Sequence, residues 1–144
     1  MRDDVSRADL DAELEDRFVR LRSPLGVTSF GINKIVFAPG QRNRIHRHRN
    51  QEEVYLVLEG TLTLMVEGEP VELERGELIR VGPDVRRQLV NRGPGQLSLL
   101  ALGGTVEHEH VPRDGEVFTA WEDATARSPQ EVPLPDDLPA DELR

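Results

Sequence analysis

The stretch HRHRNQEE, which begins at His46, contains two histidines and two glutamates at a spacing suited to metal binding. Side chains two positions apart in an extended strand point to the same side, so His46 and His48 would share a face. If Glu53 lies on the next strand, two imidazoles and one carboxylate converge. Such a set binds zinc, iron, manganese or nickel and leaves coordination positions open for a ligand. A lone His-x-His pair in a charged loop is more often only solvated.

The surrounding sequence predicts many short strands separated by glycine, proline and asparagine signals. The expected strands cover residues 18–22, 27–30, 32–38, 43–48, 53–58, 61–67, 70–74, 78–81, 86–91, 96–102 and 116–119. The segment EGEP at 67–70 is expected to form a tight hairpin loop with Gly68 at positive φ. In VYLVL, from Val54 to Leu58, both faces of the strand are apolar. These features indicate an all-β sandwich or barrel whose outer face is also covered.

The spacing around His46 resembles the first motif of the cupin family, G-x5-H-x-H-x(3,4)-E-x6-G. Here Gly40, His46, His48, Glu53 and Gly60 fill every fixed position, and Glu53 rather than Glu52 lies six residues before the last glycine. The resemblance covers about residues 18–122. It implies an all-β cupin jelly roll, a double-stranded β-helix barrel with the three ligands at its mouth.

The second cupin motif, G-x5-P-x-G-x2-H-x3-N, matches less well. Gly76 and Asn91 are in place, but Asp84 stands where glycine is usual. Arg87 stands where the family has its fourth metal ligand, a histidine. Arginine stays protonated and has no acceptor lone pair, so Arg87 cannot bind a metal.

Three arrangements of Arg87 are open. It could pair with Glu53 in a bidentate fork, where its charge would repel a divalent ion by several kcal/mol at about 4 Å. It could instead lean over a metal held by the three ligands and bind an anionic substrate. It could also point outward, or lie at the edge of the core and pair with Glu77 or Asp84. The complete first motif favours metal binding slightly.

Two classes of function follow. One is a metal-dependent enzyme acting on a small anionic molecule, since dioxygenases, isomerases and decarboxylases occur among similar cupins and the fold alone does not choose between them. The other is a metal-free module that binds a sugar or an organic acid, with a Glu53–Arg87 pair filling the ligand site. Tyr55 shares the face of Glu53 and is expected to line the cavity, and Arg44 is expected to share the face of His46 and bind substrate. His108 and His110 form a second pair, expected to be solvated.

The composition frames these expectations. The net charge is -9, and residues 1–15 and 128–144 each contribute -4, which argues against nucleic-acid binding. There is no cysteine. No signal-like or membrane-spanning apolar run is found, so a cytoplasmic protein without membrane contact is expected. We predict a polar segment at 1–16, where Leu10 and Leu14 allow a short helix, a barrel at 17–122 and an extended acidic, proline-rich tail at 123–144. The resemblance and the apolar strands predict a homodimer.

Overall fold

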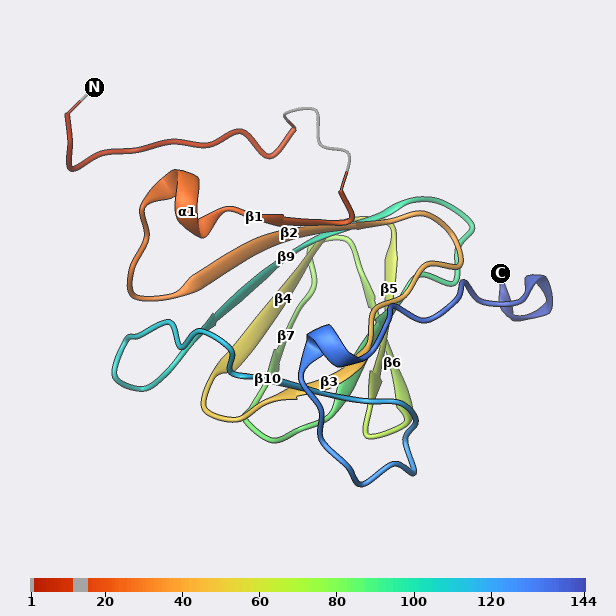
Figure 1. Ribbon diagram of the computed structural model, residues 1–144. Coiled ribbons are helices and arrows are strands. Elements are labelled where there is room, and N and C mark those ends of the chain that lie inside the picture. Colours follow the sequence, from red (N-terminus) through yellow and green to blue (C-terminus); the bar gives the residue numbers. More distant parts are fainter. Residues whose placement is uncertain (1, 12–15) are drawn as a thin grey trace.

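Two five-stranded antiparallel sheets face each other across one core (Figure 1). The computed structural model describes residues 2–11 and 16–144. The strands are β1 Phe18–Arg20, β2 Gly31–Phe37, β3 Ile45–His48, β4 Glu52–Glu59, β5 Thr61–Val66, β6 Glu69–Glu74, β7 Leu78–Val81, β8 Arg87–Val90, β9 Leu97–Gly104 and β10 Gly115–Phe118. The first sheet has the order β1-β2-β9-β4-β7, and the second has the order β10-β3-β8-β5-β6. The predicted all-β jelly roll is confirmed.

The core forms because apolar residues alternate along strands that face the opposite sheet. In β9, Leu97 and Leu99 point into the core and are fully buried. Leu100, on the other face of the strand, is only half-buried. In β4, Tyr55 and Val57 are buried in the same way. The core cluster draws on both sheets and comprises Ile35, Phe37, Tyr55, Val57, Leu62, Leu64, Leu73, Val81, Leu89, Leu97, Leu99 and Ala101.

Two tight turns use glycine at positive φ, and the first is the hairpin loop predicted at 67–70. The β5–β6 hairpin turns at Glu67 and Gly68, which both have positive φ, a combination that matches the twist of the flanking strands. Gly60, between β4 and β5, has φ 78°, and a Cβ there would lie 2.3 Å from the carbonyl oxygen of Gln96. Only glycine fits at this position, which explains the last residue of the first motif in physical terms.

The segment before β2 differs from the prediction. Residues 27–30 do not form a strand, and a single helical turn, α1 at Arg22–Leu25, ends at Gly26 in the left-handed conformation. Residues 3–11 form turns and extended chain rather than the short helix, and Leu14 lies outside the described residues. No helix within residues 2–11 and 16–144 has the length and apolar character needed to cross a membrane.

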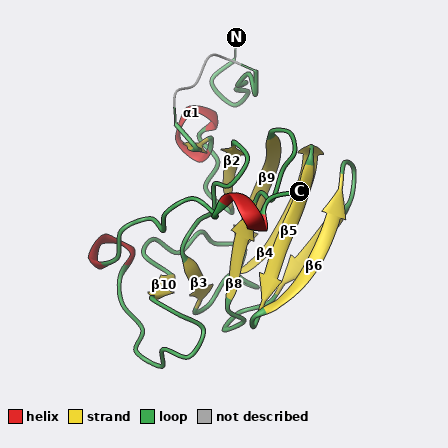
Figure 2. Cartoon of the chain, turned by 90° about the vertical axis from the view of Figure 1, so that its right-hand side faces the viewer, coloured by secondary structure: helices red, strands yellow, loops and turns green. Residues whose placement is uncertain are grey.

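The C-terminal residues run back along the second sheet, as Figure 2 shows beside β8 and β5. They are mostly extended, with two 3-10 turns, η1 Pro129–Glu131 and η2 Ala140–Glu142. The backbone N–H of Leu138 donates to the carbonyl of Gly40, and that of Arg144 donates to the carbonyl of Arg92. The acidic, proline-rich segment is therefore attached to the barrel by backbone hydrogen bonds.

Candidate metal centre and ligand cavity

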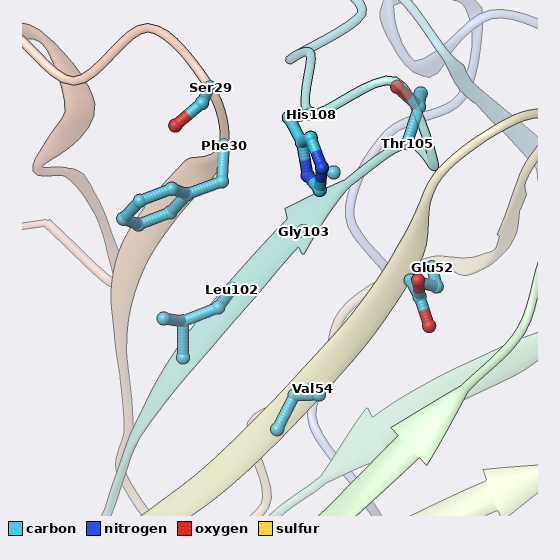
Figure 3. Close-up of a pocket in the computed structure, with 9 residues that line it drawn as sticks. Ser29, Phe30, Glu52, Val54, Leu102, Gly103, Thr105 and His108 are labelled. Atoms are coloured by element: carbon cyan, nitrogen blue, oxygen red, sulfur yellow. The ribbon is translucent and has the colours of Figure 1, made fainter.

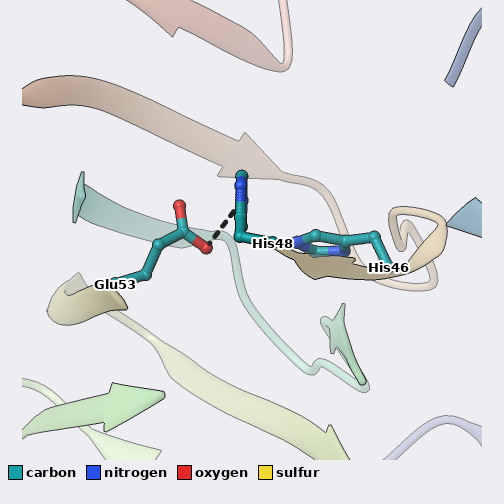
Figure 4. Close-up of side chains that lie close together, drawn as sticks. All are labelled: His46, His48 and Glu53. Carbon is teal, nitrogen blue, oxygen red and sulfur yellow. Dashed lines mark ion pairs between the residues drawn. The ribbon is translucent and has the colours of Figure 1, made fainter. Parts of the chain in front are cut away.

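The three predicted ligands come from two consecutive strands, one in each sheet, and point toward one another (Figure 4). His46 and His48 project from β3 in the second sheet, and Glu53 projects from β4 in the first. One ligand atom from each of the three lies within 4.8 Å of those of the other two. The Nε2 atom of His48 lies 3.3 Å from Oε1 of Glu53. The two-residue alternation along β3 therefore brings the imidazoles together as the sequence predicts.

The turn between β3 and β4 is held by Asp114, a buried acid just before β10. Its carboxylate accepts hydrogen bonds from the backbone N–H groups of Asn50 and Gln51 and from the Asn50 side-chain amide, at 2.8 to 3.1 Å. Burial opposes ionisation of Asp114, but these bonds outweigh it and lower the pKa of the carboxyl. Asp114 thus fixes the short connection that sets His48 against Glu53.

Each histidine turns its Nδ1 atom toward an oxygen outside the cluster. In His46, Nδ1 lies 2.9 Å from the carbonyl oxygen of Arg44, so Nδ1 carries the proton and Nε2 is left with a lone pair. In His48, Nδ1 faces the Asp114 carboxylate at 3.6 Å, an ion-pair rather than a hydrogen-bond distance. Burial, and then the charge of Arg87, lowers the pKa of His46 to about 4. His46 is therefore a neutral ligand at ordinary pH.

Glu53 is the acceptor at the centre of a buried hydrogen-bond network. Its Oε1 atom accepts a bond from the Tyr55 hydroxyl at 2.6 Å and from Nη2 of Arg87 at 2.5 Å. Arg87 also donates from Nε to the Tyr55 hydroxyl at 3.1 Å and from Nη1 to the carbonyl of Val85 at 2.8 Å. Burial alone would raise the pKa of Glu53, but His48, Arg87 and His46 together hold it well below its ordinary value. The carboxylate stays ionised.

The same network keeps Tyr55 and Arg87 in their ordinary charge states. Burial, and then the adjacent Glu53 carboxylate, raises the pKa of the Tyr55 phenol, so it remains a neutral donor. Burial disfavours the charged form of Arg87, but Tyr55 and Glu53 outweigh it and raise the pKa of the guanidinium. The group at the fourth-ligand position is therefore a buried, permanent cation.

The structure decides between the arrangements considered for Arg87. The outward orientation is wrong, because the Arg87 side chain is 0% exposed, and the core-edge pair with Glu77 or Asp84 is wrong, because Arg87 pairs with Glu53 inside the barrel. The bidentate fork is replaced by a single contact to Oε1 of Glu53. Among residues 2–11 and 16–144, no donor bonds to Oε2 of Glu53. One carboxylate oxygen is therefore not consumed by the ion pair.

Arg44 does not join the site, because the chain bulges just before β3. Arg42 pairs with Val90 and His46 pairs with Arg87, so the first strand uses four steps where its partner uses three. The extra residue breaks the alternation that would place Arg44 on the face of His46. Its Nε donates instead to the carbonyl of Val132 in the C-terminal segment, at 2.5 Å. The expected substrate role is not supported.

A cavity of about 380 Å³ opens between the sheets beside the cluster. This volume lies within the range of small-molecule sites, about 300–1,000 Å³. Its walls are formed by Phe18, Arg20, Asn33, Ile35, Asn43, His46, Glu53, Tyr55, Leu89 and Ala101. The predicted position of Tyr55 on the cavity wall is therefore observed. Asn43 takes the place that was expected for Arg44.

His108 and His110 lie on opposite sides of the first sheet. His108 is exposed and lines a separate hollow of about 400 Å³ over the outer face of β4 and β9, together with Phe30, Val54 and Leu102 (Figure 3). The expectation of a solvated segment fits His108 but is wrong for His110. The Nδ1 atom of His110 is buried, and a Cβ on Gly31 would lie 3.0 Å from it.

The donor set fits a divalent cation. Two imidazoles with outward Nδ1 atoms and a carboxylate with one oxygen outside the ion pair can supply three protein ligands. Arg87 is the unfavourable element, because its charge contacts the same carboxylate. His46, His48 and Glu53 would hold the ion, with Asp114 supporting His48 from behind.

Comparison with known proteins agrees with this architecture. Residues 33–103 match the Cupin_2 family model, described as a cupin domain. A cupin protein from Bacteroides fragilis superposes with a TM-score of 0.65 at 21% identity, over 77% of this chain and 92% of that chain. A sugar phosphate isomerase of the cupin superfamily from Silicibacter pomeroyi gives a TM-score of 0.62 at 22% identity, over 88% and 82%. At these identities the likeness shows the fold alone.

A curated relative is closer in sequence, and the match covers about half of each protein. The tetracenomycin polyketide synthase protein TcmJ of Streptomyces glaucescens is 37% identical over 71 residues, which are 49% of this chain and 48% of that protein. The chain spans about half the length of the curated relatives it matches. Together with the barrel and the His-His-Glu cluster, these matches show that the protein is a small conserved-barrel cupin of the Cupin_2 family.

Proposed function

We propose that this cupin is a metal-dependent enzyme of the dioxygenase or isomerase type that acts on a small organic anion. The observation that carries the proposal is the convergence of His46, His48 and Glu53 within 4.8 Å beside a cavity of about 380 Å³. Zinc, iron, manganese and nickel all suit two imidazoles and a carboxylate. When bound, such an ion polarises a ligand oxygen or activates oxygen.

The remaining side chains orient and stabilise the ligand. Tyr55 and Arg87 hold Glu53 in one position through hydrogen bonds to its Oε1 atom. Arg87 uses three of its five N–H donors for Glu53, Tyr55 and Val85 and is fully buried behind the cavity wall, so it acts on the ligand by holding Glu53 and Tyr55, which do line the cavity. The apolar walls at Leu89 and Ala101 exclude water around the rest of the ligand.

Elemental analysis tests the proposal. Protein grown with iron, manganese, zinc and nickel available should contain close to one metal ion per chain, and the His46→Ala variant should contain almost none. His108→Ala is the matched control, because His108 lies on the outer face. A metal-free natural protein that behaves like His46→Ala would contradict the proposal.

A metal-free binding module is the second candidate, and the Glu53–Arg87 pair favours it. The pair places a positive charge 2.5 Å from the carboxylate that a cation would need. Arg87→His separates the two functions. If this variant gains tight metal binding that the natural protein lacks, the binding module is supported. If the natural protein already binds metal and the variant has the same affinity, the binding module is contradicted.

We also propose that two copies of the chain associate. Support comes from the outer face of the first sheet, where Val54 and Leu102 line the hollow in Figure 3. On the adjacent strand β7, Leu78 is exposed and pairs with Leu56, two residues along β4 from Val54. Light scattering coupled to size exclusion should give twice the mass of one chain, and Leu78→Asp should shift it toward one chain. A natural protein of single-chain mass at micromolar concentration would contradict association.

A cytoplasmic location stays a prediction.

A further inference from the structure

The cavity beside the cluster has one apolar side and one polar side. Phe18, Ile35, Leu89 and Ala101 form the apolar side, and Phe18 packs edge-on against Phe37 with ring centroids 5.6 Å apart. His46, Glu53 and Tyr55 form the polar end. A ligand that satisfies both sides has an apolar body and at least one polar head.

Arg20 stands on the inner face of the first sheet, at the edge strand β1. It pairs directly with Asn33, and Phe18 pairs with Ile35, so these four side chains lie on the same face. All four line the cavity. Arg20 is exposed on β1 whereas Glu53 is largely buried, which places the guanidinium at the entrance to the cavity.

Arg20 is also a cation on the cavity wall that has no anionic partner among the described residues. Its guanidinium makes no hydrogen bond or ion pair with residues 2–11 and 16–144. Glu53 is the one acid of the lining, and Arg87 already neutralises it at 2.5 Å. A ligand anion would supply the missing partner.

Two further nitrogen groups lie near Arg20, because the charges of Arg20 and Arg22 both act on the His110 ring. The Nε atom of Arg22 and the Nδ1 atom of His110 are buried and have no hydrogen-bond partner among the described residues. Burial, and then the charges of Arg22, His48 and Arg20, lowers the pKa of His110, although Asp114 opposes this. The Asp114 carboxylate is already bonded to Asn50 and Gln51. Outside the Glu53–Arg87 pair, two arginines, Arg20 and Arg22, thus share one nearby acid, Asp114.

We propose that Arg20 recognises the anionic head of an amphipathic organic acid whose apolar body lies against Phe18, Ile35 and Leu89. This inference rests on the proposed function only for the presence of a ligand in the barrel. It narrows the substrate class from any small anion to an acid with an apolar body, and it assigns anion recognition to β1 rather than to Arg44.

Benzoate, benzamide and phenyl phosphate are suitable probes, because they share one apolar ring and differ in the head group. Binding is followed by the NMR shifts of the side-chain amides of Asn33 and Asn43, which both line the cavity. The test variant is Arg20→Gln. The matched control is Arg75→Gln, since Arg75 is exposed in the turn between β6 and β7, away from the cavity wall.

Benzoate should bind at least tenfold more tightly than benzamide, and Arg20→Gln should lose at least tenfold of the benzoate affinity without changing that for benzamide. Arg75→Gln should bind benzoate like the natural protein. If phenyl phosphate binds best and depends on Arg20, the anionic head is a phosphate and the inference still holds. Equal benzoate affinity in Arg20→Gln, equal binding of benzamide and benzoate, or no binding of either anion at millimolar concentration overturns it.

Metal content measured on the same samples tests the metal centre separately from the role of Arg20. A protein that holds metal but whose benzoate affinity is unchanged in Arg20→Gln contradicts the role of Arg20 alone. A metal-free protein whose benzoate affinity falls in Arg20→Gln contradicts the metal centre alone.

Discussion

The chain contains two His-x-His pairs with the same spacing and different surroundings. His46 and His48 lie on β3, where extended backbone turns both rings to the same face beside Glu53. The second pair lies in the loop after β9, where His108 has φ 60°. That left-handed residue breaks the alternation, so His108 lines an outer hollow while His110 packs over Gly31. Spacing alone therefore does not make a site, because a regular strand must convert it into a shared direction.

The largest difference should be in stability, when the acid next to each histidine pair is replaced. Glu53 neutralises a buried arginine, whereas Glu109, between the second two histidines, is exposed. With a chelator present, Glu53→Ala should lower the free energy of unfolding by about 3–5 kcal/mol, because it leaves Arg87 buried and unpaired. Glu109→Ala should change it by less than about 0.5 kcal/mol. Urea unfolding at pH 7 measures both, and similar values would contradict a network that depends on Glu53.

The two histidine pairs should also differ in how low pH changes the free energy of unfolding. The pKa of His46 is lowered to about 4 in the fold, so below about pH 6.5 the unfolded chain binds a proton that the folded chain does not. The free energy of unfolding should therefore fall between about pH 6.5 and pH 4, with His46 contributing up to about 3 kcal/mol. In His46→Gln that contribution should be absent, and in His108→Gln it should remain. A pH profile of urea unfolding with equal slopes in the two variants would contradict a neutral, buried His46.

The support behind the first pair gives a smaller effect. Asp114→Asn weakens the hold on the turn at Asn50 and Gln51 and removes the charge facing Nδ1 of His48. Metal affinity, measured by competition with a chelator, should fall about 10- to 100-fold. Asp84→Asn is the control, because Asp84 is exposed in the turn before β8. Unchanged affinity in Asp114→Asn would show that the carboxylate acts only on the fold.

Much of the fold follows from local pattern. The strands from β2 to β10, apart from small shifts at their ends, and the β5–β6 turn are read from apolar alternation and glycine signals. The strand predicted at 27–30 is wrong. The chain instead forms a helical turn at Arg22–Leu25, which ends on Gly26. A helix this short leaves too little periodicity in the sequence to be recognised.

The site was predictable where strands are regular and not elsewhere. His46, His48, Glu53, Tyr55 and Arg87 follow from alternation and motif spacing, but the bulge before β3 turns Arg44 away and brings Asn43 in. Asp114 and His110 come from a loop far along the chain, and only tertiary packing places them. The acid just before the last strand, in DGEVF, was the one available signal for Asp114. Arg20 gave none, since an arginine at an edge strand is common on any surface.

The nitrogen shifts of the four histidine rings test the central claim most directly. Zinc added to natural protein labelled with ¹⁵N in histidine should move the Nε2 resonances of His46 and His48 at one equivalent, while their Nδ1 atoms stay protonated or unligated and the rings of His108 and His110 show no ligation. Glu53→Gln should weaken the effect and leave the ring assignment unchanged. Zinc-induced ligation of the second pair instead, or no change in any of the four rings, would contradict a metal centre inside the barrel.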